Sequence, residues 1–180
     1  LKQVVAIAAG GVHSLALKRN GTVVAWGGNA ASQCDVPAGL NKVMAIAGGM
    51  YHSLALKKNG TVVAWGENTW GQAMVPEGLT DVVAIAAGGN HSLGLKKDGT
   101  VISWGTYGLA QCSVPDGLTN VVAIATGDYH GLALLKDGTL ISWGFNTASQ
   151  CDIPQGISNV VAIAARGSHS MVLVDQAASA

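Results

Sequence analysis

Short apolar runs and glycine-containing turns recur along the chain, and each histidine lies 39 positions after the previous one. The histidines are His13, His52, His91, His130 and His169. The tryptophans of the Trp-Gly pairs keep the same step, at Trp26, Trp65, Trp104 and Trp143, as do the prolines, at Pro37, Pro76, Pro115 and Pro154. A repeat of this length indicates stacked copies of one small structural unit. We therefore expect a single repeat domain, 1–180, with units 1–39, 40–78, 79–117 and 118–156 and a partial fifth, 157–180.

Each complete unit predicts three short strands. The first, such as VVAIA at 82–86, is apolar throughout, which is typical of a strand covered on both faces. The second, such as HSLAL at 13–17, leads through an Asn-Gly or Asp-Gly pair to the third, such as TVVAWG at 61–66. These pairs predict tight hairpins in which both turn residues adopt positive φ angles. No segment shows helical periodicity.

Three short strands that are apolar on both faces are not stable alone, but they are stable when stacked on copies of themselves. The predicted fold is therefore all-β, a β-propeller or a propeller-like array of three-stranded antiparallel blades, with four full units and a partial fifth. The pattern stops at Val174, where we expect a true C-terminus, whereas Leu1 begins inside a motif. Three arrangements remain open: a small closed ring, an arc completed by a second chain, and the ordered part of a longer protein.

The motif VVAIAAGGxHSLALKxDGTVVAWG, followed by GQ and VP, resembles the repeat of the regulator-of-chromosome-condensation family. Its short spacing is most similar to the branch of β-lactamase-inhibitory protein II, which has three-stranded blades. The resemblance covers residues 1–173 and implies a β-propeller. It implies less about function, because the family includes nucleotide-exchange factors, photoreceptors and enzyme inhibitors. In the inhibitory branch, aromatic residues on the loop rim contact the target enzyme.

Composition and charge narrow the classes of partner. The chain has 10 basic and 10 acidic residues, a balance that argues against nucleic acid and anionic membrane as partners. Charged residues make up 11% and hydrophobic residues 49%, which suits a dense apolar core. No apolar run approaches the roughly 18 residues of a membrane span. The sequence does not decide between a secreted and a cytoplasmic location.

Strand direction predicts that the loops before each histidine and after each Trp-Gly share one face, which we call the loop face. These loops vary between units, whereas the opposite turns hardly vary. The predicted partner-binding residues are Met50, Tyr51, Glu67, Trp70, Asn90, Tyr107, Asp128, Tyr129 and Phe145. Aromatic side chains carry much of the energy of protein interfaces.

From this face we expect a non-enzymatic binding module for a protein, such as an enzyme that it inhibits, or for a carbohydrate. The alternative is a structural protein whose incomplete array self-associates through unclosed blades. We predict no cofactor, metal or catalytic residue. Glu67 and Asp128 are the only acidic residues in the variable loops. Two carboxylates from different blades can act as a hydrolase pair, but nothing in the sequence fixes their separation.

The repeated polar and aromatic residues are predicted to be structural. We expect each imidazole to bond to the backbone of a neighbouring blade. A serine that follows its histidine points to the opposite face of the strand, which argues against a Ser–His nucleophile. Cys34, Cys112 and Cys151 are expected to be small buried thiols, with a reactive thiol or an inter-chain bridge as the alternative. The Trp-Gly tryptophans are expected in the core.

Overall fold

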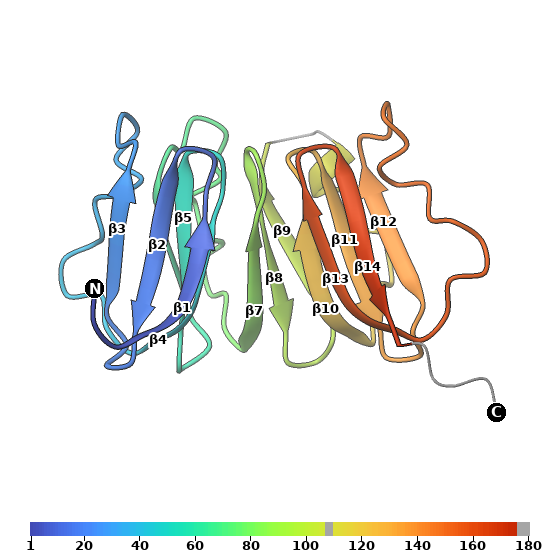
Figure 1. Cartoon of the computed structure of the whole chain (residues 1–180), viewed down its shortest axis with the longest axis horizontal. Coiled ribbons are helices and arrows are strands. Elements are labelled where there is room, and N and C mark those ends of the chain that lie inside the picture. The colour runs from blue at the N-terminus through green and yellow to red at the C-terminus, as the bar shows by residue number, and fades with distance from the viewer. Residues whose placement is uncertain (107–109, 176–180) are drawn as a thin grey trace.

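The computed structural model describes residues 1–106 and 110–175, and within them the fold is a stack of five antiparallel sheets (Figure 1). We call the sheets blades 1 to 5. Blade 1 contains β1 (Val4–Ala9), β2 (His13–Lys18) and β3 (Val23–Gly27). Blade 2 contains β4 (Val43–Gly48), β5 (His52–Lys57) and β6 (Val62–Gly66). Blade 3 contains β7 (Val82–Ala87), β8 (His91–Lys96) and β9 (Val101–Gly105), followed by a short 3₁₀ helix, η1 (Ala110–Cys112). Blade 4 contains β10 (Val121–Thr126), β11 (His130–Leu135) and β12 (Leu140–Gly144), and blade 5 contains β13 (Val160–Arg166) and β14 (His169–Val174).

The hairpin between the second and third strands is a three-residue loop and not the tight pair expected from the sequence. In blade 1, the N–H of Gly21 donates to the carbonyl of Lys18 at 2.8 Å, and Gly21 alone of the Asn-Gly pair has positive φ, at 78°. The Asn20 side chain instead accepts from the N–H and the hydroxyl of Thr22, at 3.1 and 2.7 Å. The expectation of two positive φ angles was therefore wrong, because the loop is a type I turn closed by a left-handed glycine.

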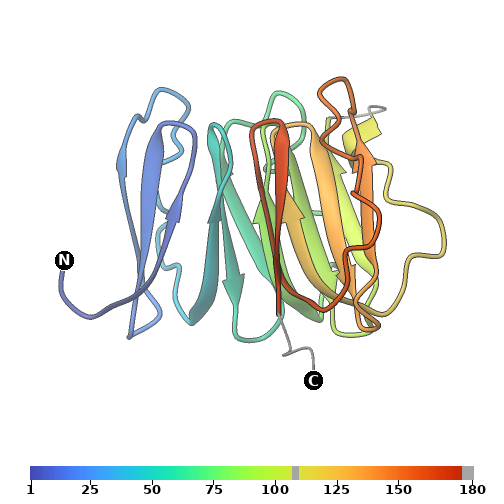
Figure 2. The same ribbon diagram turned by 45° about the vertical axis from the view of Figure 1, so that its right-hand side comes forward.

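The first strands lie innermost and line one axial channel, with Ala8, Ala47, Ala86, Ala125 and Ala164 on its wall. Figure 2 shows the blades standing next to one another, with their strands running between the same two edges of the molecule. The hydrophobic core lies between consecutive blades. Between blades 1 and 2 it joins Leu15 and Leu17 of one sheet to Val43, Ala55 and Trp65 of the next. In blade 2, Ile46 packs against this core and Ala45 against the next, so the first strand contacts a neighbour on each side. The expected cover is only partial, because Met44, Val83 and Val122 at the second position of these strands are 45–53% exposed.

The histidines connect each blade to the next through side-chain hydroxyls. Nε2 of His13 lies 2.9 Å from the Ser53 hydroxyl, and Nε2 of His52 lies 3.0 Å from that of Ser92. The Ser53 hydroxyl donates its own hydrogen to the carbonyl of Gln33, at 2.9 Å, so it accepts a hydrogen from the imidazole. The expected backbone partner was therefore wrong. The two side chains meet because the serine comes from the following blade.

This histidine–serine pair has the composition of a nucleophile and its base, but it lies out of reach of a substrate. His52, Ser53 and Ser92 are fully buried. Burial, followed by the charges of the neighbouring histidines, lowers the pKa of His52 to about 3. A neutral imidazole fixed between two blades is a structural element, as the sequence indicated.

Blade 4 shows how the connection survives the loss of its serine. Gly131 stands at the serine position, and Thr126 is its cross-strand neighbour in the sheet. The Thr126 hydroxyl lies 2.6 Å from Nε2 of His91 and also donates to a backbone carbonyl, that of Gly127 or His130. The hydroxyl thus comes from the adjacent strand of the same blade, and His91 stays fully buried.

The blades form an arc rather than a closed ring, because blades 1 and 5 each keep an apolar face exposed. Trp26 is 45% exposed, whereas its counterparts Trp65, Trp104 and Trp143 are 6–7% exposed. The indole N–H of Trp65 donates to the carbonyl of Gln33 in the preceding unit, and no described blade offers Trp26 such a partner. The expectation of a core position therefore holds for three tryptophans and was wrong for Trp26.

Candidate functional site

The loops before each histidine and the loops after each Trp-Gly lie at the same end of the blades, as strand direction predicted. In Figure 1 they form the upper edge, and the hairpins between second and third strands form the lower edge. Loops from several blades are therefore side by side on the loop face.

Two side chains hold the loop after Trp-Gly in a fixed shape. In the first unit, Oδ1 of Asn29 accepts the N–H of Cys34 at 2.7 Å, and Oε1 of Gln33 accepts the N–H of Ala31 at 2.9 Å. The second and fourth units repeat this arrangement through Asn68 with Gln72 and Asn146 with Gln150. The loop face is thus a constrained surface whose tip residues are free to vary.

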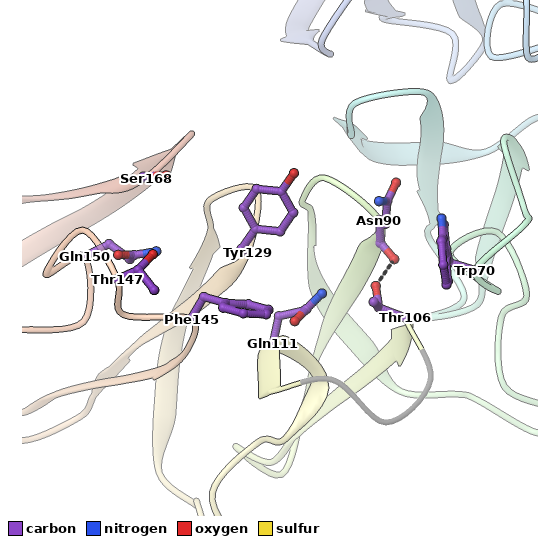
Figure 3. Close-up of a pocket in the computed structure, with 9 residues that line it drawn as sticks. All are labelled: Trp70, Asn90, Thr106, Gln111, Tyr129, Phe145, Thr147, Gln150 and Ser168. Atoms are coloured by element: carbon purple, nitrogen blue, oxygen red, sulfur yellow. Dashed lines mark hydrogen bonds between the residues drawn. The ribbon is translucent and has the colours of Figure 1, made fainter.

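A pocket of about 470 Å³ opens on this face across blades 2 to 5 (Figure 3). It is lined by Trp70, Asn90, Thr106, Gln111, Tyr129, Phe145, Thr147, Gln150 and Ser168. The rings of Tyr129 and Phe145 make an edge-to-face contact, with centroids 6.1 Å apart and an interplanar angle of 77°. Trp70, Tyr129 and Phe145 are 40–50% exposed, so the pocket presents apolar ring surface to solvent.

The polar groups of the pocket are uncharged. The Thr106 hydroxyl donates to the carbonyl of Asn90 at 2.5 Å, and Oε1 of Gln150 accepts the N–H of Ala148 at 2.9 Å. Gln111 is 2% exposed, and its Oε1 has no hydrogen-bond partner among the described residues. The pocket therefore combines aromatic walls with one buried acceptor, Oε1 of Gln111, that has no hydrogen-bond partner in residues 1–106 and 110–175.

Four of the predicted binding residues line this pocket: Trp70, Asn90, Tyr129 and Phe145. Tyr51 is 40% exposed on the loop before β5, outside the pocket lining. Met50 and Asp128 take part in backbone hydrogen bonds between blades, at 3.1 Å to Gly88 and 2.9 Å to Gly167. Tyr107 lies outside the described residues.

Glu67 belongs to its own loop rather than to a pair of carboxylates. Its carboxylate accepts from the N–H of Thr69 at 2.9 Å and from the Thr69 hydroxyl. These bonds lower the pKa of Glu67. The group is therefore engaged as a loop cap, and the structure gives no support to a hydrolytic role with Asp128.

Sequence reasoning missed five of the lining residues: Thr106, Gln111, Thr147, Gln150 and Ser168. Gln111 and Gln150 occupy a constant position of the repeat, so variation between units could not reveal them. The available signal was the third unit, which has Tyr107 where Asn29, Asn68 and Asn146 stand in the others. In this unit the glutamine lies in η1 (Ala110–Cys112), and its Oε1 has no partner among the described residues.

The cysteines are half-buried, so the expectation of buried thiols was only partly right. The thiol of Cys112 donates to the carbonyl of Gly105 at 2.9 Å, and burial raises its pKa. All three cysteines are free. In the described part of the chain, no group of three histidine, cysteine or acidic side chains could hold a metal ion. No helix within 1–106 or 110–175 is long and apolar enough to cross a membrane.

Several solved structures resemble this chain. Prp20p of Saccharomyces cerevisiae, described with its binding properties to Gsp1p and histones, superposes with a TM-score of 0.81 at 24% identity, over 94% of this chain and 55% of that one. Yeast Prp20 bound to Kap60 gives 0.77 at 26% identity, over 94% and 53%. The ectodomain of the receptor kinase CR4 of Physcomitrella patens gives 0.70 at 28% identity, over 91% and 45%.

This chain therefore spans about half the length of these relatives. No curated protein matches it by sequence at a significant level. The model of the Regulator of chromosome condensation (RCC1) repeat matches residues 4–33, 45–72, 82–106 and 121–150, which together exceed half of the chain. The chain belongs to the RCC1 repeat family.

Proposed function

We propose that this chain is a non-enzymatic protein-binding module that uses the pocket and the surrounding aromatic residues of the loop face. The observation that carries the proposal is the exposure of Trp70, Tyr129 and Phe145 around one pocket on a constrained scaffold. Half-exposed rings in a concave site gain free energy when a partner removes them from water. Similar proteins bind other proteins, as the structures of Prp20 with its partners describe. A closer relation to β-lactamase-inhibitory protein II stays a prediction.

The test replaces Trp70, Tyr129 and Phe145 with alanine and compares the proteins captured from the native source by this variant and by wild type. Each candidate partner is then purified and titrated by calorimetry. We expect affinity to fall at least about a hundredfold, since hot-spot residues cost about 2 kcal/mol or more each. Trp26→Ala is the matched control, because it removes an equally exposed indole away from the pocket. Equal affinity of the triple variant and wild type for every purified partner contradicts the proposal.

The second candidate function is self-association, and the exposed end faces favour it. Met171 and Leu173 of blade 5 are 56% and 62% exposed, whereas Leu15 and Leu17 at the same repeat positions of blade 1 are buried by blade 2. Ile7, on the opposite free face of blade 1, is 78% exposed. A second copy could cover one face with the other. Sedimentation over a range of concentrations tests this, and a monomer at every concentration contradicts it.

A further inference from the structure

We propose that the pocket receives one aromatic side chain of the partner that carries a ring donor, tryptophan or tyrosine, and that this donor bonds to Oε1 of Gln111. This inference rests on the proposed function and names the group that the partner inserts. It follows from the hydrogen bonding of Gln111, the walls of the pocket and the absence of charge along its lining.

Gln111 differs from its three repeat counterparts in the bonding of its side chain. Oε1 of Gln33, Gln72 and Gln150 each accepts a loop N–H at 2.9 Å, from Ala31, Trp70 and Ala148. Oε1 of Gln111 has no partner among the described residues, although the side chain is as buried as the others. The backbone of Gln111 keeps the common role, because its carbonyl accepts the indole N–H of Trp143 at 3.1 Å. The residue is therefore held in place by its backbone, while its side-chain acceptor has no partner among the described residues.

The walls around this acceptor suit a flat apolar ring. Figure 3 shows the Gln111 side chain between those of Phe145 and Thr106, with Trp70 beyond Thr106. Rings prefer edge-to-face or offset contacts, and the Tyr129–Phe145 pair already offers one ring edge and one ring face. A volume of about 470 Å³ lies within the roughly 300–1,000 Å³ typical of sites that enclose small ligand groups.

The polar groups favour an aromatic side chain over a sugar or a charged group. None of the described residues that line the pocket is charged, so an inserted ammonium, guanidinium or carboxylate would be desolvated without a counter-charge. A sugar would bring several hydroxyls, each of which needs a partner when buried. Among its described residues, the pocket has one deeply buried acceptor without a partner, and Thr147 and Ser168 are exposed. One ring with one donor satisfies Gln111 and leaves no buried polar atom of its own unpaired.

The test uses N-acetyl-tryptophanamide and its 1-methylindole analogue as probes, titrated by NMR against the whole chain. We expect saturable binding of the first and about tenfold weaker binding of the second, because a single hydrogen bond is worth about a factor of ten. In Gln111→Leu, both probes should bind with the weaker affinity, so that the preference disappears. Gln33→Leu is the matched control, and it should keep the preference because Gln33 lies outside the pocket lining.

Three results would overturn the inference: equal binding of both probes to wild type, an unchanged preference in Gln111→Leu, or saturable binding of neutral monosaccharides in place of the indole. These results are distinct from failure of the proposed function. If the alanine triple variant loses its purified partner but wild type binds neither probe, the loop face remains the binding surface and the aromatic anchor is rejected.

Discussion

Blades 2 and 5 carry the same motif but differ in the state of its histidine. His52 in blade 2 is fully buried and bonded to Ser92 of blade 3. His169 in blade 5 is exposed, because no described blade follows it. The motif therefore specifies a histidine that can bond to the next blade, and the presence of that blade decides whether the side chain is buried.

The residue at the end of the first strand also differs between blade 5 and the other four blades. In blades 1 to 4 this position is a glycine: Gly10, Gly49, Gly88 or Gly127. A Cβ added there would overlap the ring of the histidine in the same blade. Blade 5 has Arg166 instead, and β13 runs on through it to pair with His169. Blade 5 therefore carries a large side chain at a position where the histidine ring of blades 1 to 4 leaves no room for a Cβ.

Arg166 also takes over a hydrogen bond that a blade would otherwise make. The carbonyls of Gly49 and Gly88 accept N–H groups of the preceding blade, from Gly11 at 3.0 Å and from Met50 at 3.1 Å. The equivalent carbonyl of blade 1, that of Gly10, accepts from Nη2 of Arg166 at 2.8 Å. The guanidinium thus joins the last blade to the first across the axis, at a site where internal blades use their backbone.

The largest expected effect comes from placing the blade 5 residue into blade 2. In Gly49→Arg, the new Cβ would overlap the His52 ring and approach the carbonyl of Gly88 to 2.7 Å. Because the ring is held between two blades, we expect a loss of more than about 4 kcal/mol in the free energy of unfolding. Urea denaturation measures this loss. A loss below about 1 kcal/mol would show that the His52 ring can move away from the added side chain.

A smaller loss of stability is expected when the pH is lowered, because buried histidines are harder to protonate than unfolded ones. The folded pKa of His52 is lowered to about 3 and that of His91 to about 4, mainly by burial, whereas an unfolded histidine titrates near 6.5. Below pH 6.5 the unfolded chain therefore binds more protons, and stability falls with pH until the folded pKa is reached. Between pH 6 and pH 5 each of the two histidines should contribute a slope of about 1 kcal/mol per pH unit.

Urea midpoints measured across this range test the slope. Glutamine does not titrate. In His52→Gln the slope of the free energy of unfolding against pH should therefore fall by about 1 kcal/mol per pH unit, although the variant is less stable at every pH. A stability that stays constant from pH 7 to pH 5 would contradict the buried, neutral state of the internal histidines.

The smallest expected effect is that of Arg166→Met. Its two hydrogen bonds to the carbonyls of Ala9 and Gly10 are exposed, so we expect a loss of no more than about 1 kcal/mol in urea denaturation. The charge of Arg166 adds to burial in lowering the pKa of His13. That pKa should therefore rise in the variant, by NMR titration, and Arg166→Lys is the control that keeps the charge. An unchanged pKa of His13 in Arg166→Met would argue against the contact between the two ends of the arc.

Much of the architecture could be predicted because the repeat keeps its length. A constant step of 39 residues fixes which residues are equivalent, and alternating strand direction places the variable loops at one end. Tyr129 and Phe145 could therefore be assigned to the loop face without coordinates. Their edge-to-face contact and the pocket beside them depend on the distance between two loops, and the repeat pattern does not predict that distance. The division into units and a single domain stays a prediction.

The sequence by itself determined the strands, the stacking of blades and the face on which the loops vary, because these depend on local patterns repeated in register. Only the tertiary structure decided which copies of a repeated residue are buried, bonded or free. Trp26 and Trp65 have the same neighbours in sequence, yet one is exposed and the other is in the core. Gln111 and Gln33 share a position, yet the side-chain acceptor of Gln33 is bonded and that of Gln111 has no partner in the part of the chain that the structure describes. The reason is physical: burial and hydrogen bonding belong to contacts between blades and loops, and equivalent residues at different places in the array meet different neighbours.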